Sequence, residues 1–196
     1  KSLWQQTVKM KIQNQSAVLN SLGYDVDNMR YWQKSVRSGD PDNYEGRAAA
    51  YYWKTIFSDY IEQFKRGRYE PDPNHLLNYG YAVLRAVIAR SLVASGCLPT
   101  LGIHHRHKYN AYCLADDIME PYRPFVDKIV LGIIESGFET EKLTPTIKQK
   151  LLQIPAIDVI IDNKSSPLMI AAQRTSASLS ACFEGIQRKL LYPELI

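Results

Sequence analysis

The chain has 196 residues, and its 24 Lys and Arg side chains exceed its 20 Asp and Glu side chains, giving a formal charge of +4. Hydrophobic residues at 45% and charged residues at 22% are ordinary for a globular core, which excludes a wholly disordered, collagenous or low-complexity chain. No apolar run approaches the roughly 20 residues that a membrane span needs, so we expect no membrane partner. The charge permits a nucleic-acid partner without requiring one.

Cysteine usage and the first residues bear on the cellular setting. Cys97, Cys113 and Cys182 are an odd number, lie far apart and form no close pair, so neither a disulfide framework nor a thiolate zinc site is indicated. We therefore expect a reducing, cytoplasmic location. The chain lacks an initiator Met and a signal-peptide pattern, and we expect that it begins at a cut edge.

Apolar residues recur at helical spacing along most of the chain. The pattern predicts about seven helices, near residues 1–22, 25–39, 44–64, 74–95, 115–134, 145–152 and 172–190. Pro121 and Pro124 predict a kink, or two abutting helices, within the fifth. The fourth is apolar nearly all round from Leu76 to Val93, which is typical of a central, fully surrounded helix.

One short segment near residues 157–170 departs from helical spacing. Residues 157–161 and 168–170 are apolar and flank Asp162-Asn163-Lys164-Ser165, which predicts a small β-hairpin. The fold class that we expect is therefore mainly α, as a single helical domain over residues 1–196 with one hairpin.

The most unusual segment, Gly102 to Asn110, places His104, His105 and His107 within four positions. Histidine is the commonest metal ligand in proteins and titrates near neutrality. Taken alone, such a cluster in a basic loop is more often solvated surface or a phosphate contact than a metal site.

Three acidic residues could complete a metal site. Asp117 and Glu120 lie three apart, on one face of a helix, and their apolar flanks mean that ionised carboxylates need a partner. A divalent cation is one such partner, and Arg123 is the structural alternative. Glu45 lies near a predicted helix N-terminus, where an acid complements the helix dipole without further purpose. Gly46 beside it leaves room for a close partner, although close packing explains it equally well.

Six segments in order resemble the CRISPR adaptation integrase, the CRISPR-associated endonuclease that inserts new spacers, particularly the version from type II systems. The matching residues are Leu3–Gln6 with Lys9–Gln15, Tyr44–Gly46, Leu77–Ala86, Gly102–His105, Asp117–Pro124, and Gln173–Thr175 with Cys182–Gly185. The resemblance implies a helical catalytic domain that performs metal-dependent endonuclease and integrase chemistry on DNA. Its reaction is attack of a DNA 3′-hydroxyl, or of water, on a phosphodiester.

The resemblance also implies a site. Glu45, His105 and Glu120 map onto the catalytic residues that hold Mg²⁺ or Mn²⁺, and Asp117 and His104 onto supporting positions. Carboxylate oxygens with one imidazole and no thiolate suit these ions better than structural zinc. Phosphate contacts with the spacer precursor and the CRISPR repeat have as candidates Arg47, Lys54, Arg106, Lys108, Arg123 and Arg174.

Family members have an N-terminal β-domain, used in forming a homodimer and in contacts with a small ferredoxin-like CRISPR-associated nuclease. This chain begins where the helical domain should begin, so we expect a fragment without the β-domain. Two other readings stay open. One is a non-catalytic helical DNA-binding or assembly fragment of the same integrase. The other makes the histidine cluster a structural zinc site, which predicts loss of the fold with a chelator.

Overall fold

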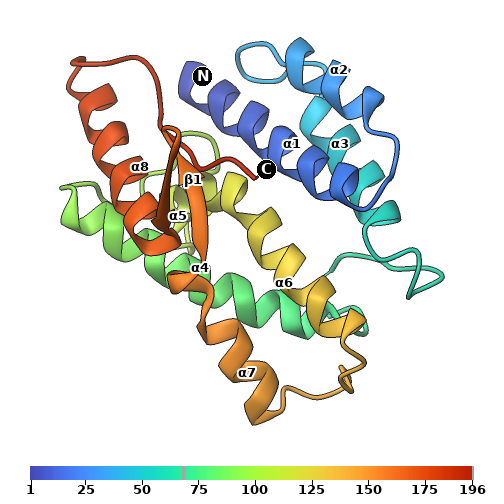
Figure 1. Ribbon diagram of the computed structural model, residues 1–196. Coiled ribbons are helices and arrows are strands. Elements are labelled where there is room, and N and C mark those ends of the chain that lie inside the picture. The colour runs from blue at the N-terminus through green and yellow to red at the C-terminus, as the bar shows by residue number, and fades with distance from the viewer. Residues whose placement is uncertain (68, 196) are drawn as a thin grey trace.

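Helices dominate the computed structural model, which describes residues 1–67 and 69–195 (Figure 1). The elements in chain order are α1 (Ser2–Ser21), α2 (Asp27–Ser35), α3 (Tyr44–Thr55), α4 (Asn74–Ala94), α5 (Cys113–Met119), the 3-10 helix η1 (Glu120–Tyr122), α6 (Arg123–Glu135), α7 (Pro145–Leu152), the 3-10 helix η2 (Ile154–Ala156), β1 (Asp158–Ile161), β2 (Lys164–Pro167) and α8 (Leu168–Phe183). The prediction of a mainly α fold with one hairpin is confirmed.

α1 is the element around which the others gather. In Figure 1 it lies between the α2–α3 pair and the remaining helices, and it contacts α2, α3, η1 and α6. Its buried polar residue Asn14 donates to the carbonyls of Pro121 (2.7 Å) and Pro193 (3.0 Å) and accepts from the backbone of Leu195 (3.0 Å). A buried amide satisfied in this way fixes its neighbours, because any shift leaves a polar group unpaired. Asn14 therefore ties η1 and the C-terminal segment to α1.

The predicted kink in the fifth helix is a real break. Pro121 and Pro124 cannot donate backbone hydrogen bonds, and the chain passes from α5 through η1 into α6 at these residues. The Tyr122 hydroxyl lies 2.6 Å from Thr175 Oγ1 of α8, and both side chains are buried. The break thus holds η1 in a fixed place between α1 and α8.

The hairpin has a tighter turn than expected. β1 pairs antiparallel with β2, with Ile161 opposite Lys164, and only Asp162 and Asn163 form the turn, both at positive φ. Two such residues suit the two-residue turn whose twist matches the strands. Lys164 and Ser165 are therefore strand residues, and the predicted second strand at 168–170 is wrong, since those residues begin α8.

Three predicted helices end early. α2 ends at Ser35 rather than at Gly39. α3 ends at Thr55 rather than near Phe64, and there the Thr55 hydroxyl donates to the Tyr51 carbonyl while Ser58 donates to the Thr55 carbonyl. Such side chains compete with the helical backbone bonds. α8 ends at Phe183 rather than Leu190, because Gly185 adopts φ +77°, the left-handed conformation that commonly follows a helix C-terminus.

The fourth predicted helix is not fully surrounded. α4 packs against α8, α5 and α6, but Ala82, Arg85, Ala86, Arg90 and Val93 are exposed along one face. The alanines on this face are small, and the arginines extend their charged ends into the solvent, so the face can be exposed to water.

The three cysteines are free thiols, and no helix in residues 1–67 and 69–195 is long and apolar enough to cross a membrane.

Asp127 of α6 joins three helices in the core. It is 1% exposed and accepts hydrogen bonds from the hydroxyls of Tyr52 (2.9 Å) on α3 and Tyr81 on α4. Burial raises the pKa of Asp127 to about 7, because the two tyrosine hydrogen bonds and the nearby Arg123 only partly offset the loss of solvation.

This shift predicts how stability changes with pH. The ordinary pKa of Asp127 is 3.8, so between about pH 4 and pH 7 the folded state keeps a proton that the unfolded state has lost. The stability that this proton gives the folded state is lost as pH rises through that range. We expect the melting temperature of the wild type, relative to Asp127→Asn, to fall by at least about 3 °C over this range. A difference in melting temperature that stays constant with pH would contradict the assignment.

Candidate metal centre

Glu45 is held at the N-terminus of α3 by two caps. Asp40 accepts from the backbone N–H groups of Tyr44 (3.0 Å) and Glu45 (2.9 Å), and Asn43 accepts from that of Gly46 (3.2 Å). Side-chain caps of this kind satisfy donors that a helix leaves free at its start. A Cβ on Gly46 would lie 2.6 Å from Asn43 Oδ1. The glycine therefore makes room for the cap.

Glu120 begins η1 and is 8% exposed. Its Oε1 accepts from Arg123 Nε at 2.7 Å, and its Oε2 lies 2.5 Å from the ammonium of Lys11 on α1. Burial alone would raise the pKa of Glu120, but the charges of Arg123 and Lys11 outweigh it and lower that pKa to about 2. Glu120 is thus an ionised, buried carboxylate. The structural alternative that the sequence raised, pairing with Arg123, is present.

Lys11 joins Glu120 to Glu45. Its Nζ also lies 2.7 Å from Glu45 Oε1, and its side chain is only 12% exposed. Although burial lowers it, the charges of Glu120 and Glu45 raise the pKa of Lys11 above its ordinary value. Two carboxylates from distant parts of the chain therefore converge on one cationic nitrogen.

His105 is oriented by Asp117. Asp117 is fully buried, and its Oδ1 lies 2.5 Å from His105 Nδ1 while its Oδ2 accepts from the backbone of His104 at 2.8 Å. A carboxylate only accepts, so Nδ1 carries the proton and Nε2 is left without a partner among the described residues. The bond to Asp117 raises the pKa of His105 against the effect of burial, and the charges of Asp117, Glu120 and Glu45 add to it.

Trp4 of α1 packs against the loop that carries His104 and His105. Its ring stacks on His104, with centroids 4.2 Å apart and planes 3° from parallel, and meets His105 edge-on at 5.4 Å. Gly102 permits the close approach of this loop to α5. An added Cβ would lie 2.3 Å from the His105 carbonyl oxygen and 2.8 Å from Asp117 Oδ2.

The donor chemistry fits a hard divalent ion. No three His, Cys, Asp or Glu side chains within residues 1–67 and 69–195 are arranged to hold a metal, and Lys11 bridges the two carboxylates. Two convergent carboxylates and an imidazole with a free Nε2, turned by a buried carboxylate, are nevertheless the ligand types and the supporting contact that such ions use.

A pocket of about 660 Å³ opens beside these groups. Its lining residues are Arg85, His105, Arg106, His107, Tyr109, Asn110, Asp116, Glu120 and Arg123. Tyr109 is 82% exposed, and Arg85 pairs with Asp116 at 2.7 Å. The pocket thus combines three guanidinium groups, two of them paired with the carboxylates of Asp116 and Glu120, with the exposed ring of Tyr109.

The predicted phosphate contacts fall into three groups. Arg106 and Arg123 line the pocket with His105 and Glu120. Arg47 and Lys54 are exposed on α3, and Lys108 is exposed in the loop with its ammonium over the Tyr109 ring. Arg174 instead donates to Ile161 and Asp162, so it fastens α8 to the hairpin turn.

Sequence reasoning assigned no role to Lys11, Trp4 or Arg85. A usable signal existed for Lys11, which falls at helical spacing on the α1 stripe formed by Trp4, Val8, Gln15 and Val18. A lysine on a buried stripe requires an anionic partner. Nothing in the sequence indicated that both partners would be predicted metal ligands.

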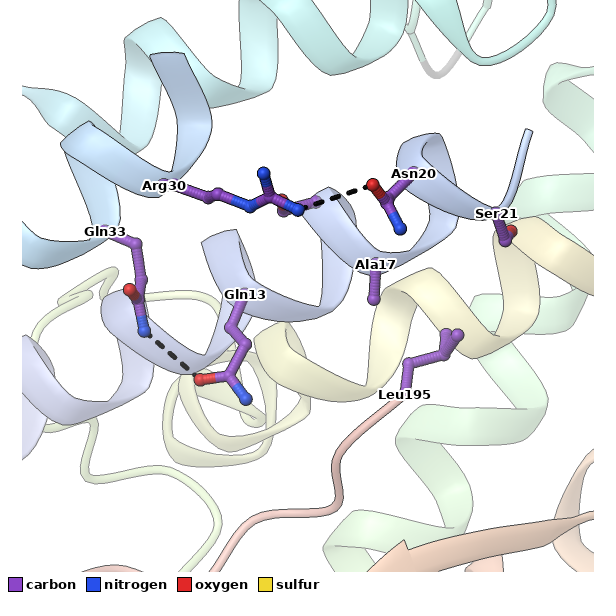
Figure 2. A pocket seen from close by; sticks show the side chains of 8 residues that line it. Gln13, Ala17, Asn20, Ser21, Arg30, Gln33 and Leu195 are labelled. Atoms are coloured by element: carbon purple, nitrogen blue, oxygen red, sulfur yellow. Dashed lines mark hydrogen bonds between the residues drawn. The ribbon is translucent and has the colours of Figure 1, made fainter. Parts of the chain in front are cut away.

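A second cavity, of about 380 Å³, lies between α1 and α2 and shares no lining residue with the pocket at His105. Figure 2 shows Gln33 facing Gln13, to which it donates at 3.1 Å, with Leu195 at the edge. Arg30 is its one charged residue among those described, and it reaches Asn20. These contacts hold α2 on α1 and include no carboxylate or imidazole.

Comparisons with known proteins agree on one family. The family model described as CRISPR associated protein Cas1 matches residues 2–158. A protein named CRISPR-associated endonuclease Cas1, from Neisseria meningitidis serogroup C (strain 8013), is 38% identical over 199 residues, covering 100% of this chain and 64% of that protein. The chain therefore spans less than two thirds of that relative's length.

Two solved structures share the fold. A casposase bound to integration product has a TM-score of 0.77 at 24% identity, covering 95% of this chain and 61% of the other. A Cas6-RT-Cas1–Cas2 complex contains a chain with a TM-score of 0.78 at 22% identity, covering 96% of this chain and 24% of the other.

The geometry at Gly102 yields a prediction. Gly102→Ala forces the new methyl group into the His105 carbonyl and Asp117, so we expect a loss of about 1–3 kcal/mol in the free energy of unfolding. The control is Gly132→Ala in α6, where an added Cβ meets nothing within 4 Å and alanine stabilises a helix by up to about 1 kcal/mol. Urea unfolding measures both, and equal shifts would contradict the packing described for Gly102.

Proposed function

The chain belongs to the Cas1 family of CRISPR-associated endonucleases, and we propose that its helices carry the metal-dependent centre that cuts and joins DNA when new spacers enter a CRISPR array. One observation carries the proposal. The carboxylates of Glu45 and Glu120 meet at a single cationic nitrogen, that of Lys11, and Glu120 lines one pocket with His105.

Glu45, Glu120 and His105 Nε2 would hold Mg²⁺ or Mn²⁺, which as a Lewis acid polarises a phosphoryl oxygen and orients an in-line nucleophile. Asp117 keeps the proton on His105 Nδ1, which leaves Nε2 as the nitrogen that would bind the ion. The stacked His104 and Trp4 hold the loop that carries His105. Arg123 keeps Glu120 ionised and in place.

DNA would enter through the pocket beside Glu120. Arg106 and Arg123 line it and would contact phosphates, with Arg85 as a third guanidinium that the structure adds. Lys108, Arg47 and Lys54 are exposed cations that would extend this contact. Tyr109 offers an open ring on which an unpaired base would stack. Arg174 is a weaker candidate, because it is held by the hairpin turn and does not line this pocket.

The assembly of the whole protein is part of the proposal. We propose that the full-length protein acts as a homodimer with a small ferredoxin-like CRISPR-associated nuclease, on a spacer precursor and the CRISPR repeat. A solved Cas1–Cas2 complex and a casposase on its integration product share the fold of this chain, which supports the assignment.

A non-catalytic DNA-binding or assembly role is the second candidate. The observation in its favour is that Lys11 bridges the two carboxylates and that the described residues hold no assembled three-ligand group. The two candidates differ in whether these residues support metal-stimulated cleavage.

The test is a nuclease assay on branched DNA with Mn²⁺. We expect cleavage by the wild type, loss with EDTA, a fall of about 10- to 100-fold in Asp117→Asn, and at least as large a fall in Glu120→Gln. Glu62→Gln removes the charge of an exposed residue and should leave the rate unchanged.

Three outcomes would contradict the proposal. Undiminished cleavage by Glu120→Gln would remove that residue from the centre. DNA binding in EDTA without cleavage in Mn²⁺ would favour the assembly role. Loss of the helical circular dichroism with EDTA would point to a structural zinc site instead.

A further inference from the structure

We infer that Lys11 is the resident counterion of the metal-free centre, that it gives up its place when the metal binds, and that its ammonium then pairs with a phosphate of the DNA. This inference rests on the proposed function. It assigns to Lys11 the positioning of the carboxylates and the coupling of metal binding to DNA binding.

The geometry places Lys11 where a metal would be needed. Its Nζ lies 2.7 Å from Glu45 Oε1 and 2.5 Å from Glu120 Oε2, on carboxylates from two different elements. Without a cation between them, these carboxylates would repel each other in a site largely closed to water. Lys11 therefore preserves the separation of the two ligands while no metal is bound.

The charges explain why Lys11 must yield. Lys11 and Arg123 carry two positive charges and Glu45 and Glu120 two negative ones, so the cluster is neutral as it stands. A divalent ion on the same oxygens would leave it with two excess positive charges. An ammonium and a metal ion at the same oxygens repel each other strongly at an effective dielectric constant of about 20. Metal binding thus requires that Lys11 move, that an anion arrive, or both.

An adjoining cavity offers a place for the displaced ammonium of Lys11 and for an incoming anion. It has a volume of about 190 Å³, and Lys11, Arg66 and Arg123 line it. Its two acidic residues are Glu120 and Asp127, which already accept hydrogen bonds from other groups. A flexible lysine turned into this space would meet guanidinium groups, so it needs an incoming anion, and a DNA phosphodiester supplies one.

The consequence is a reciprocal coupling. Lys11 weakens the binding of the metal alone, and DNA relieves that competition by pairing with the released ammonium. By linkage, the metal strengthens DNA binding by the same factor as DNA strengthens metal binding.

Isothermal titration with Mn²⁺ tests the inference, using the wild type, Lys11→Met and the control Lys9→Met. Lys9 lies on the same helix without an ion pair among the described residues, so its variant loses the same charge outside the cluster. Without DNA, we expect Lys11→Met to bind Mn²⁺ at least about tenfold more tightly than the wild type, and Lys9→Met to match the wild type.

The same titration is repeated with a branched DNA at 4 °C, followed by a denaturing gel to confirm that the DNA is intact. DNA should tighten Mn²⁺ binding by at least about fivefold in the wild type and by a smaller factor in Lys11→Met. An equal factor in both proteins would overturn the coupling.

The melting temperature in EDTA distinguishes a counterion role of Lys11 from a role in packing alone. Lys11→Met should melt at least about 5 °C below the wild type in EDTA, and Mn²⁺ should raise its melting temperature by more than it raises that of the wild type. If Lys11→Met fails to fold in EDTA, Lys11→Arg keeps the test open. Arginine retains the competing charge, so its Mn²⁺ affinity should not exceed that of the wild type.

The failures are distinguishable. Equal Mn²⁺ affinity in the wild type and Lys11→Met, or tighter binding by Lys11→Arg, would overturn the inference and leave the proposed function standing. Absence of Mn²⁺ binding in every variant would overturn the proposed function, and the inference with it.

Discussion

Two carboxylates that share one ammonium group, Glu120 buried and Glu45 partly buried, set the main constraint on this structure. An ionised carboxylate cannot be removed from water without a compensating charge, and Glu45 and Glu120 both depend on Lys11 for it. This single contact brings together the middle of α1, the N-terminus of α3 and the start of η1. Buried ion pairs add little net stability over apolar packing. The energetic cost of burying this ion pair is explained if the carboxylates serve to bind a cation in the active protein.

The surrounding structure holds these groups more rigidly than a charge cluster alone would require. Asn14 fixes the backbone of Pro121, next to Glu120, and Asp40 caps the turn that carries Glu45. Asp117 uses both oxygens to hold the loop of His105, and Gly102 provides the space for that loop. Because supporting contacts of this kind determine how well a ligand is aimed, they belong to the site as much as the ligands do.

The helices were predictable from the sequence because their apolar spacing is strong, and the hairpin because its turn residues are distinctive. Helix ends were harder. The early end of α3 depends on the hydroxyls of Thr55 and Ser58, which also fit a helix, and the end of α8 depends on the backbone conformation of Gly185. The exposed face of α4 depends on what packs against it, which no local pattern states.

The candidate site also has parts that could be predicted from the sequence and parts that could not. The family resemblance mapped Glu45, His105, Asp117 and Glu120 onto site positions, and in the structure Lys11 joins Glu45 to Glu120 while Asp117 contacts His105. The bridge through Lys11 was not predictable, because it depends on how α1, α3 and η1 meet in space.

The central claim is that the position held by Lys11 is a metal position. Anomalous diffraction from crystals grown with Mn²⁺ measures this directly. The account predicts an anomalous peak in contact with Glu45, Glu120 and Nε2 of His105, with the ammonium of Lys11 turned away from between the carboxylates. A peak elsewhere, or no peak with Lys11 still bridging both carboxylates, would contradict it.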